Sequence, residues 1–454
     1  MQQGLLRQYE QRAANAAKPI YRVEINCVED APIPDELKDL AAANGFSGVE
    51  GAVLAGTQGV LLGVGDGRDP FVTAAAAGLP EGDYVFASDM EDRAARHACL
   101  GWLIGGYRFD RYKEQKPAAA RLIAPPGVDV EAVGREAAAT FLVRDLVNTP
   151  AEDMSPDAIE DAARKLAGAY SAQIAVTTGD DLLTENLNMI HAVGRAAAAA
   201  PRLIDFSWGP ENAPSLTLVG KGVAFDSGGL NMKNATGMAL MKKDMGGAAH
   251  ALGLAQMIMA AGLRLRLRVL IPAVENAVSG NAFRPGDVLR GRKGLTVEIG
   301  NTDAEGRLIL ADAMALAAEE GPDMMITLAT LTGAARVALG PELAPFYCDD
   351  AAFAAALETA AARVADPVWR MPLWRNYESM LSSAIADVNH ISGGSFAGSI
   401  TAALFLSRFA EGAASWAHFD IYAWRPRAAP GRPVGGEAQA IRAVFDVLQT
   451  RYGR

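Results

Sequence analysis

The amino-acid sequence predicts an α/β protein in which a small N-terminal α/β domain is joined by a helix to a larger C-terminal α/β domain with a mostly parallel central sheet. The chain has 454 residues, and at roughly 100–200 residues per domain this length allows two or three domains. Hydrophobic residues make up 50% of the chain and charged residues 21%, so a sizeable core can form. Short apolar runs alternate with alanine-rich helical stretches, which is typical of α/β folds.

The first domain is expected over residues 1–127. Short apolar runs separated by turn residues occur within residues 19–87, and a helical stretch follows at about residues 91–107. A Pro-Pro-Gly turn at residues 125–127 then interrupts the chain. Residues 128–147 keep helical spacing and are interpreted as the connecting helix.

The second domain is expected over residues 148–454. Apolar runs at residues 215–219, 267–271 and 324–328 are interpreted as strands. The alanine-rich stretches between them are expected to be helices, since alanine is the best helix former. Strands that alternate with helices in this way predict a mostly parallel sheet.

Composition argues against several classes of protein. The net charge of −11 argues against a nucleic-acid binder, because such proteins need a basic face. The three cysteines are far apart, so they form neither a disulfide framework nor a CxxC pair. The first 19 residues are too polar for a signal peptide, and no stretch reaches the ~18 apolar residues of a membrane span. We therefore expect a cytoplasmic protein with no membrane partner.

Residues 300–308, Gly-Asn-Thr-Asp-Ala-Glu-Gly-Arg-Leu, are the most informative segment. On an extended backbone Asp303 and Glu305 project to the same side, so their carboxylates converge. A helix is expected to follow over about residues 308–318, with Arg307 at its start. A cation there is unfavourable for the helix dipole, so a bound anion beside it is expected. The alternative is an ordinary surface Asp-x-Glu before a helix.

Residues 219–233 place Lys221, Asp226 and Lys233 in a glycine-rich loop after a predicted buried strand. Active sites of open α/β sheets usually lie at such strand ends. The alternative for the two lysines is a solvated loop. The Asp-Ser-Gly-Gly string at residues 226–229 superficially resembles a serine-protease nucleophile, but no motif places a histidine near it.

Asp244 precedes an apolar helix that is expected to run to about Gly262. An aspartate at a helix start is most often an N-cap, and this alternative stays open. His250 in the same helix is expected to be a packed or surface side chain and not a ligand.

These segments together contain four carboxylates, and one cleft would hold them only if cations neutralise their repulsion. Oxygen ligands without histidine or cysteine suit Mn²⁺, Mg²⁺ or Zn²⁺, and two ions about 3.5–4 Å apart with shared carboxylates balance this charge. Lys221 can ligate only as the neutral amine, which a nearby dication favours. The pattern predicts a two-metal hydrolase and leaves peptidase, phosphatase and nuclease open.

The octapeptide at residues 301–308 resembles the signature of the leucyl (cytosol) aminopeptidase family. Other matching segments lie on both sides of it, and together they cover about residues 98–434. The stronger matches are residues 220–222, 225–229, 242–249 and 328–334, and the weaker ones are residues 107–113, 144–150 and 396–402.

This resemblance implies a metal-dependent aminopeptidase that releases single N-terminal amino acids from peptides by attack of a water activated by two metal ions, Zn²⁺ or Mn²⁺. Residues 148–454 are then the catalytic metallopeptidase domain. The resemblance implies that Asp226 and Glu305 bridge both ions. It also implies that Lys221 and Asp244 complete one site, and that Asp303 completes the other.

The resemblance further implies roles outside the metal ligands. Lys233 and Arg307 match the two catalytic positions that are not ligands; Lys233 is expected to stabilise the oxyanion and Arg307 to hold a bicarbonate. Met241 falls where the family lines the pocket for the first side chain. Thr330 and Leu331 match a segment whose backbone aligns the peptide.

The expected assembly, again by resemblance, is a homohexamer whose active sites face an interior cavity. The sequence departs from the family at Asn234, where many members have proline, and at residues 419–426, where a small-residue run is usual. The first ~97 residues match only vaguely. A two-metal phosphoesterase and a non-catalytic relative that binds DNA or acts as a scaffold are the alternatives.

Overall fold

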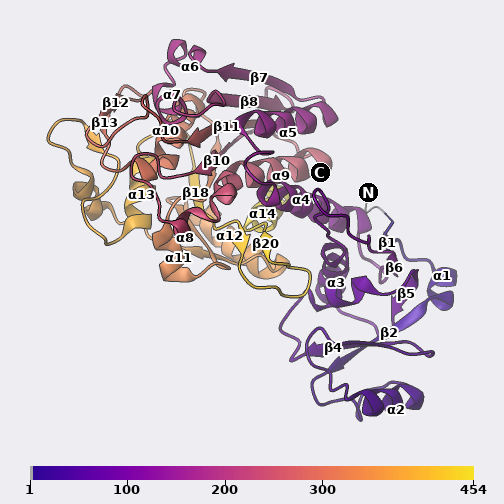
Figure 1. The fold of residues 1–454 in the computed structure, drawn as a ribbon. Coiled ribbons are helices and arrows are strands. Elements are labelled where there is room, and N and C mark those ends of the chain that lie inside the picture. The colour runs from indigo at the N-terminus through magenta and orange to yellow at the C-terminus, as the bar shows by residue number, and fades with distance from the viewer. Residues whose placement is uncertain (1–3, 454) are drawn as a thin grey trace. The chain divides into compact units, whose positions relative to one another are not determined.

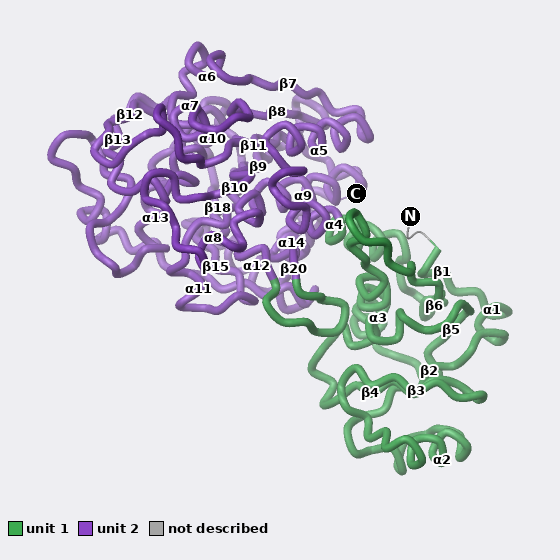
Figure 2. Tube along the Cα trace, in the orientation of Figure 1, with its two compact units in different colours: residues 1–141, 425–434 green, residues 142–424, 435–454 purple. Residues whose placement is uncertain are grey.

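The computed structural model describes residues 4–453 and shows helices and sheets in two compact units (Figures 1 and 2). Unit 1 runs to Phe141 and also contains Arg425–Val434, whereas unit 2 contains Leu142–Trp424 and the chain from Gly435. The boundary therefore falls within helix α4 (Val130–Asn148). The predicted fold class, a smaller N-terminal and a larger C-terminal α/β domain with mostly parallel sheets, is confirmed.

Unit 1 is built on a six-stranded sheet in the order β1-β6-β5-β2-β4-β3, with parallel pairing except between β3 and β4. The strands are β1 (Leu6–Arg7), β2 (Lys18–Glu24), β3 (Val53–Ala55), β4 (Val60–Gly65), β5 (Gly82–Phe86) and β6 (Ala120–Ile123). The helices before α4 are α1 (Gln11–Ala16), α2 (Asp35–Asn44), the 3-10 helix η1 (Val72–Gly78) and α3 (Asp92–Gly105). Every residue of β4 is buried, which explains its continuous apolar run.

A segment from late in the chain completes unit 1. Within this unit, Arg432 forms an ion pair with Asp69 and lies over the Phe71 ring, with its Cζ atom 5.4 Å from the ring centroid. The sequence gives no local sign of this return, because the pairing joins residues more than 350 positions apart.

Unit 2 is built on a nine-stranded sheet in the order β16-β15-β18-β14-β9-β11-β8-β7, with β10 paired to β11. The central strands β18, β14, β9 and β11 are parallel, and antiparallel strands flank them. The strands of this sheet are β7 (Gln173–Thr178), β8 (Arg202–Trp208), β9 (Ser215–Gly220), β10 (Gly222–Asp226), β11 (Arg266–Asn276), β14 (Met324–Ala329), β15 (Ala344–Cys348), β16 (Val368–Arg370) and β18 (Trp416–Asp420). The strands predicted around residues 215–219, 267–271 and 324–328 are confirmed.

Helices cover both faces of this sheet (Figure 1). Helices α9 and α14 pack together on one face, whereas α10 packs with α7 and α13 on the other. Their bounds are α5 (Pro156–Ala169), α6 (Asp181–Thr184), α7 (Asn188–Gly194), α8 (Ala235–Met238), α9 (Gly246–Ala261), α10 (Gly306–Ala318), α11 (Gly333–Leu339), α12 (Ala351–Val364), α13 (Gly398–Ser407) and α14 (Ile441–Tyr452). Leu308 of α10 lies in one buried cluster with Val219, Leu270 and Met325 of the strands, so the α10 start is held firmly against the sheet.

The remaining elements are short. They are the 3-10 helices η2 (Met241–Met245), η3 (Thr302–Ala304) and η4 (Arg375–Leu381), and the strands β12 (Val288–Arg290), β13 (Thr296–Glu298), β17 (Val388–Asn389), β19 (Trp424–Arg425) and β20 (Gly435–Gly436). Over residues 4–453, none of the helices is both long and apolar enough to cross a bilayer.

Candidate active site

Polar residues gather where the parallel strands of unit 2 end. Lys221 directly follows β9, Thr330 follows β14, and Asp420 ends β18. These three strands are neighbours and run in the same direction, so their carboxyl ends meet at one edge of the sheet. Asp226 ends β10; the loop predicted there is wrong at residues 222–226, which form this extra strand.

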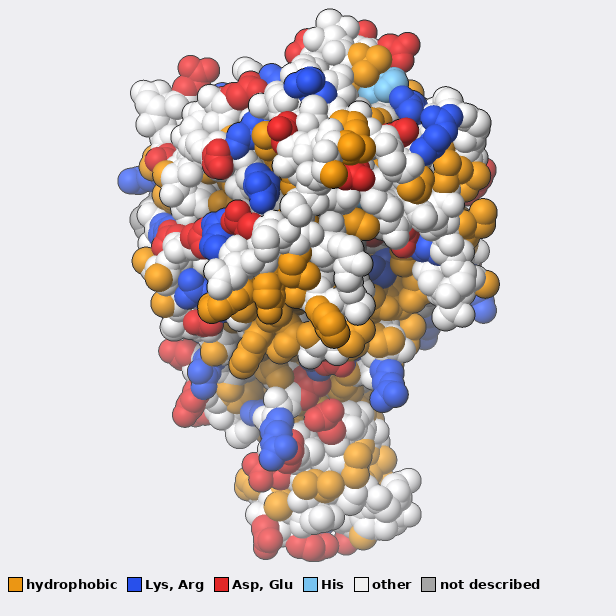
Figure 3. Space-filling model, turned by 90° about the vertical axis from the view of Figure 1, so that its left-hand side faces the viewer, with side chains coloured by type: hydrophobic (Ala, Val, Ile, Leu, Met, Phe, Trp, Pro, Cys, Tyr) orange, Lys and Arg blue, Asp and Glu red, His pale blue; other side chains and the backbone are white. Residues whose placement is uncertain are grey.

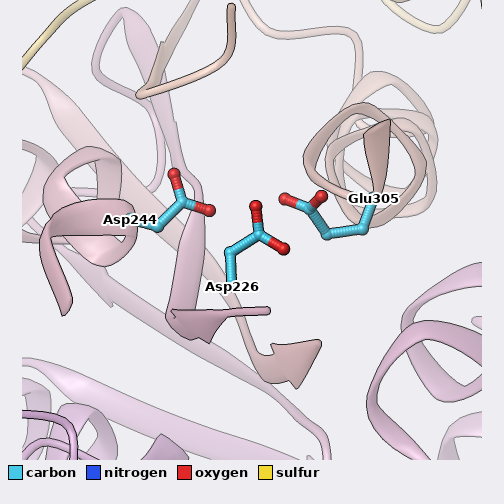
Figure 4. A group of neighbouring side chains, drawn as sticks. All are labelled: Asp226, Asp244 and Glu305. Carbon is cyan, nitrogen blue, oxygen red and sulfur yellow. The ribbon is translucent and has the colours of Figure 1, made fainter. Parts of the chain in front are cut away.

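Three buried carboxylates meet beside this edge (Figure 4). Asp226 comes from β10, Asp244 from η2, and Glu305 directly precedes α10. One oxygen of each lies within 4.8 Å of the others, and none of the three residues is more than 3% exposed. Figure 4 shows the Asp244 and Glu305 carboxylates on either side of the Asp226 carboxylate.

Two lysines tie the acidic groups together. Lys221 Nζ lies 2.7 Å from Asp244 Oδ2 and 2.9 Å from Glu305 Oε1. Lys233 Nζ lies 2.8 Å from Asp226 Oδ2 and 2.5 Å from Asp303 Oδ1. The structure thus places all four predicted acids and both predicted lysines in one cluster. Two ammonium groups do not balance four carboxylates, so the cluster has an excess of negative charge.

The backbone around Asp303 differs from the prediction. Residues 302–304 form the 3-10 turn η3, which Asn301 caps by accepting a hydrogen bond from the Asp303 amide at 2.8 Å. The extended backbone predicted here is therefore wrong. The turn directs Asp303 to Lys233 and leaves Glu305 with the buried carboxylates.

Helix α10 begins at Gly306, two residues before the predicted start. A Cβ atom at position 306 would lie 2.6 Å from Lys221 Nζ, so a larger residue here would displace the Lys221 ammonium from its place.

The alternative interpretation of Asp244 as an N-cap is also wrong. Helix α9 begins after η2 and has no side-chain cap, while Asp244 Oδ1 accepts a hydrogen bond from Thr330 Oγ1 at 2.8 Å. His250 is packed as expected: its Nδ1 lies 2.6 Å from the Gly246 carbonyl, and its Nε2 accepts from the Gln439 amide at 3.0 Å.

Burial and mutual repulsion control ionisation in the cluster. Burial first, and then the charges of Glu305 and Asp244, raise the pKa of Asp226 well above its usual value. Burial likewise raises the pKa of Asp244 to about 6, although Lys221 opposes the shift. Burial would also raise the pKa of Glu305, but Lys221 and then Lys233 lower it overall. Without more positive charge the carboxylates cannot all ionise at once.

The donor set fits divalent metal ions. Glu305 Oε2 is buried and makes no hydrogen bond to any residue of the described chain. A buried carboxylate oxygen without a donor is rare in folded proteins and indicates a missing partner, here a cation. Carboxylate oxygens and one amine are suitable ligands for Zn²⁺ or Mn²⁺.

Arg307 lies at the start of α10 with its guanidinium buried. Its Nη1 donates to the His390 carbonyl at 2.8 Å, while its Nε has no hydrogen-bond partner within residues 4–453. Burial lowers the pKa of Arg307 to about 10, although Glu305 and Asp420 oppose the shift. Among the described groups, Arg307 therefore keeps an unused donor beside the acidic cluster.

Sequence reasoning missed two residues that support the cluster. Asn276 Nδ2 donates to Asp226 Oδ1 at 2.8 Å and to the Thr302 carbonyl at 3.0 Å, and so fixes both chain segments. The His390 ring lies 3.0 Å from the Asn301 carbonyl through Nε2. Neither residue belongs to a recognisable motif, and only the fold brings them to the site.

The three predicted substrate-binding residues lie around the same edge. Met241 begins η2, three positions before Asp244. The Thr330 carbonyl accepts from Lys221 Nζ at 3.1 Å, and the Leu331 amide donates to Asp420 Oδ1 at 3.2 Å.

Comparison with known proteins identifies the family. The model of the cytosol aminopeptidase family catalytic domain matches residues 141–445, and that of the M17 aminopeptidase N-terminal domain matches residues 37–125. The chain belongs to the cytosol aminopeptidase family. The predicted resemblance is confirmed, and so is the class of enzyme: the chain is a metallo-aminopeptidase, a hydrolase.

Relatives of this family agree over nearly the whole chain. A probable cytosol aminopeptidase of Chlorobium phaeobacteroides is 36% identical over 91% of each chain. The crystal structure of the cytosol aminopeptidase from Coxiella burnetii has a TM-score of 0.91 and 42% identity, and the match covers 99% of each chain. The bottromycin maturation enzyme BotP in complex with Mn has a TM-score of 0.86 and 32% identity, covering 96% of this chain and 99% of that one.

Proposed function

We propose that this aminopeptidase releases single amino acids from the free amino end of peptides with the help of two divalent metal ions. The observation that carries the proposal is the buried group of Asp226, Asp244 and Glu305, which holds one carboxylate oxygen without a hydrogen-bond partner in the described chain. Residues 148–454 form the proposed catalytic domain, with residues 1–127 and the connecting helix 128–147 before it.

The proposed ligands are those that the family resemblance implies, and all of them lie in the cluster. Asp226 and Glu305 would each contribute to both sites, Lys221 and Asp244 would complete one site, and Asp303 would complete the other. Lys221 must lose its proton to serve as a ligand, although the carboxylates around it raise its pKa in the metal-free protein. Bound divalent ions reverse that preference, and they supply an acidified water and a polarised scissile carbonyl. The BotP structure contains Mn, which supports Mn²⁺ beside Zn²⁺ as a candidate.

The chain's own cations have separate roles. Burial alone would lower the pKa of Lys233, but Asp226 and Asp303 raise it, so this ammonium is a fixed positive charge that stabilises a developing oxyanion. Arg307 would hold a bicarbonate through its unused donor, and such an anion would supply a general base beside the cluster.

Substrate orientation depends on the groups around the cluster. Asp244 attracts the α-ammonium of the peptide, and Met241 lines the pocket for its first side chain. The backbone of Thr330 and Leu331 aligns the peptide, and Asp420 fixes this segment because it accepts the Leu331 amide.

A matched pair of peptides tests this function. The purified enzyme, with its metal content measured, is given a peptide with a free amino end and the same peptide acetylated there. We expect cleavage of the free peptide alone, one residue at a time. Equal cleavage of both would contradict an aminopeptidase, and turnover of phosphoesters in place of peptides would indicate a phosphoesterase.

We also propose a homohexamer with the active sites facing an interior cavity. Several large apolar side chains of unit 2 are exposed in the single chain, and Figure 3 shows hydrophobic side chains gathered around a hollow on one face. The most exposed of them are Val337 at 91%, Phe396 at 80% and Ile385 at 64%. Such patches usually mark protein–protein interfaces. Sedimentation should give six times the chain mass, and a monomer would contradict the proposal.

We also propose that the protein is located in the cytoplasm, which the name of its relatives supports.

A further inference from the structure

Unit 1 contains a cavity that the peptidase reaction does not use. It encloses about 190 Å³ and is lined by residues that follow the carboxyl ends of neighbouring parallel strands. Arg22 lies near the end of β2, Arg68 lies in the loop after β4, and Arg93 and His97 lie in α3, which follows β5.

The topology explains why a cavity forms here. Strands β2 and β5 are neighbours, and the chain continues from β2 to β3 and β4 on one side but from β5 to β6 on the other, so the topology switches between β2 and β5. In open parallel sheets, ligands bind in the crevice outside the strand ends at such a switch point. Gly65 at the end of β4 and Gly67 in the loop after it both have positive φ, which lets the chain turn sharply over the strand ends.

The lining is predominantly basic. Three guanidinium groups face two carboxylates, Asp69 and Glu91. Asp69 is already paired with Arg432 and accepts from the Phe71 amide at 2.9 Å, so it offsets little of the cavity's positive charge. Arg68 is paired with the exposed Asp66 outside the set of lining residues.

Two of the arginines are free to bind a ligand. Within residues 4–453, neither Arg22 nor Arg93 forms a hydrogen bond or an ion pair through its side chain. Both residues are exposed, and Glu24 lies near Arg22 without forming an ion pair with it. Arg93 lies in the first turn of α3, where a cation is unfavourable for the helix dipole and where Asp92 is the acidic residue. A bound anion would pair with both guanidinium groups.

Helix α3 adds donors of its own. Its N-cap residue, Glu91, makes no side-chain capping hydrogen bond, and the helix is 14 residues long. The amides of its first turn therefore remain available where Arg93 and Ala94 line the cavity.

We infer that this cavity binds the phosphate group of a small phosphorylated compound. Guanidinium groups match phosphate oxygens in pairs of hydrogen bonds, and helix N-termini favour the same anion. The cavity is smaller than the ~300–1,000 Å³ typical of drug-sized ligands, so it accommodates a phosphate with a few further atoms and not a nucleotide.

Calorimetric titration of the full-length, metal-loaded enzyme tests this inference, with inorganic phosphate as the probe. We expect Arg22→Gln and Arg93→Gln each to weaken binding about tenfold or more, because each removes a charge-assisted contact. Arg12→Gln is the matched control, since it removes an exposed arginine of α1 that does not line the cavity. This control should bind phosphate as the wild type does.

Two further arms locate the anion and identify its source. Asp303→Asn changes the metal cluster and should leave phosphate affinity unchanged; loss of binding in this variant alone would place the anion at the metals and overturn the inference. Equal affinity in wild type, Arg22→Gln and Arg93→Gln would overturn it too, as would no binding at ~10 mM phosphate.

Retained binding of methyl phosphate would support an ester ligand, whereas binding of inorganic phosphate alone would support free phosphate.

Discussion

Unit 2 contains two kinds of buried carboxylate, and they differ in what faces them. Asp366 accepts hydrogen bonds from the backbone amides of Ala440 and Arg442, both at 2.9 Å. It does not belong to the group of neighbouring carboxylates at the active site. Asp226 and Glu305 instead face each other and Asp244, and one Glu305 oxygen has no hydrogen-bond donor within residues 4–453. Backbone donors that satisfy an acid indicate a structural role. Acids that crowd together unsatisfied indicate that a ligand completes them.

The largest expected effect comes from removing the cations that the crowded acids need. Dialysis against a chelator should abolish peptidase activity, because the cluster keeps its excess negative charge and loses the chemistry of the ions. Added Mn²⁺ or Zn²⁺ should restore activity. Undiminished turnover in protein verified to be metal-free would show that the crowded carboxylates have another purpose.

Neutralising one bridging acid should separate activity from stability. Glu305→Gln or Asp226→Asn should lower kcat by about 10³-fold or more, since each proposed bridge contributes to electrostatic stabilisation at both ions. Thermal melting without metal should stay the same or rise, because carboxylate repulsion is relieved. Near-normal turnover in either variant would show that the bridging assignment is wrong.

Arg307→Ala tests the unused donor beside the cluster. Loss of the proposed proton-accepting anion should lower kcat by about 10²–10⁴-fold with little change in KM, because the lost interaction belongs to the transition state. Removal of dissolved bicarbonate should slow the wild type and leave the variant almost unaffected. An equal response of both proteins would place the anion elsewhere.

Asp366→Ala should have the opposite pattern. It leaves the amides of Ala440 and Arg442 without their acceptor, so the free energy of unfolding should fall by about 3 kcal/mol in urea titration. Activity per folded molecule should be unchanged. If Asp366→Ala lost activity but kept the stability of the wild type, the structural role assigned to Asp366 would be wrong.

The smallest expected effect concerns His250, a buried polar group that, like Asp366, is expected to have a structural role. Burial lowers its pKa from the usual 6.5 to about 4, so the native state favours the neutral ring. Its stabilising contribution is complete above pH 6.5 and is lost as the pH falls towards 4, because the unfolded chain takes up the proton first. His250→Gln should reduce the slope of stability against pH in this range by up to about 1.4 kcal/mol per pH unit. An unchanged slope in denaturant titrations would contradict this assignment.

The sequence was sufficient where the signal was local. The strands before Lys221 and Thr330 were predictable from apolar runs, and their parallel direction placed both residues at one edge. The η3 turn was missed because residues 301–303 are compatible both with an extended backbone and with a turn in which Asn301 accepts from the Asp303 amide. Asn276 and His390 were missed because their partners are distant in sequence and appear only when the chain is folded.

The return of residues 425–434 to unit 1 has a consequence for synthesis. A ribosome adds Arg432, the partner of Asp69, only after residues 142–424 of unit 2 have been made. Unit 1 therefore lacks this ion pair while most of unit 2 is being synthesised. A truncated transcript that ends after α4 would encode an N-terminal domain without its final piece, and the two units cannot be exchanged between related genes by a single recombination point.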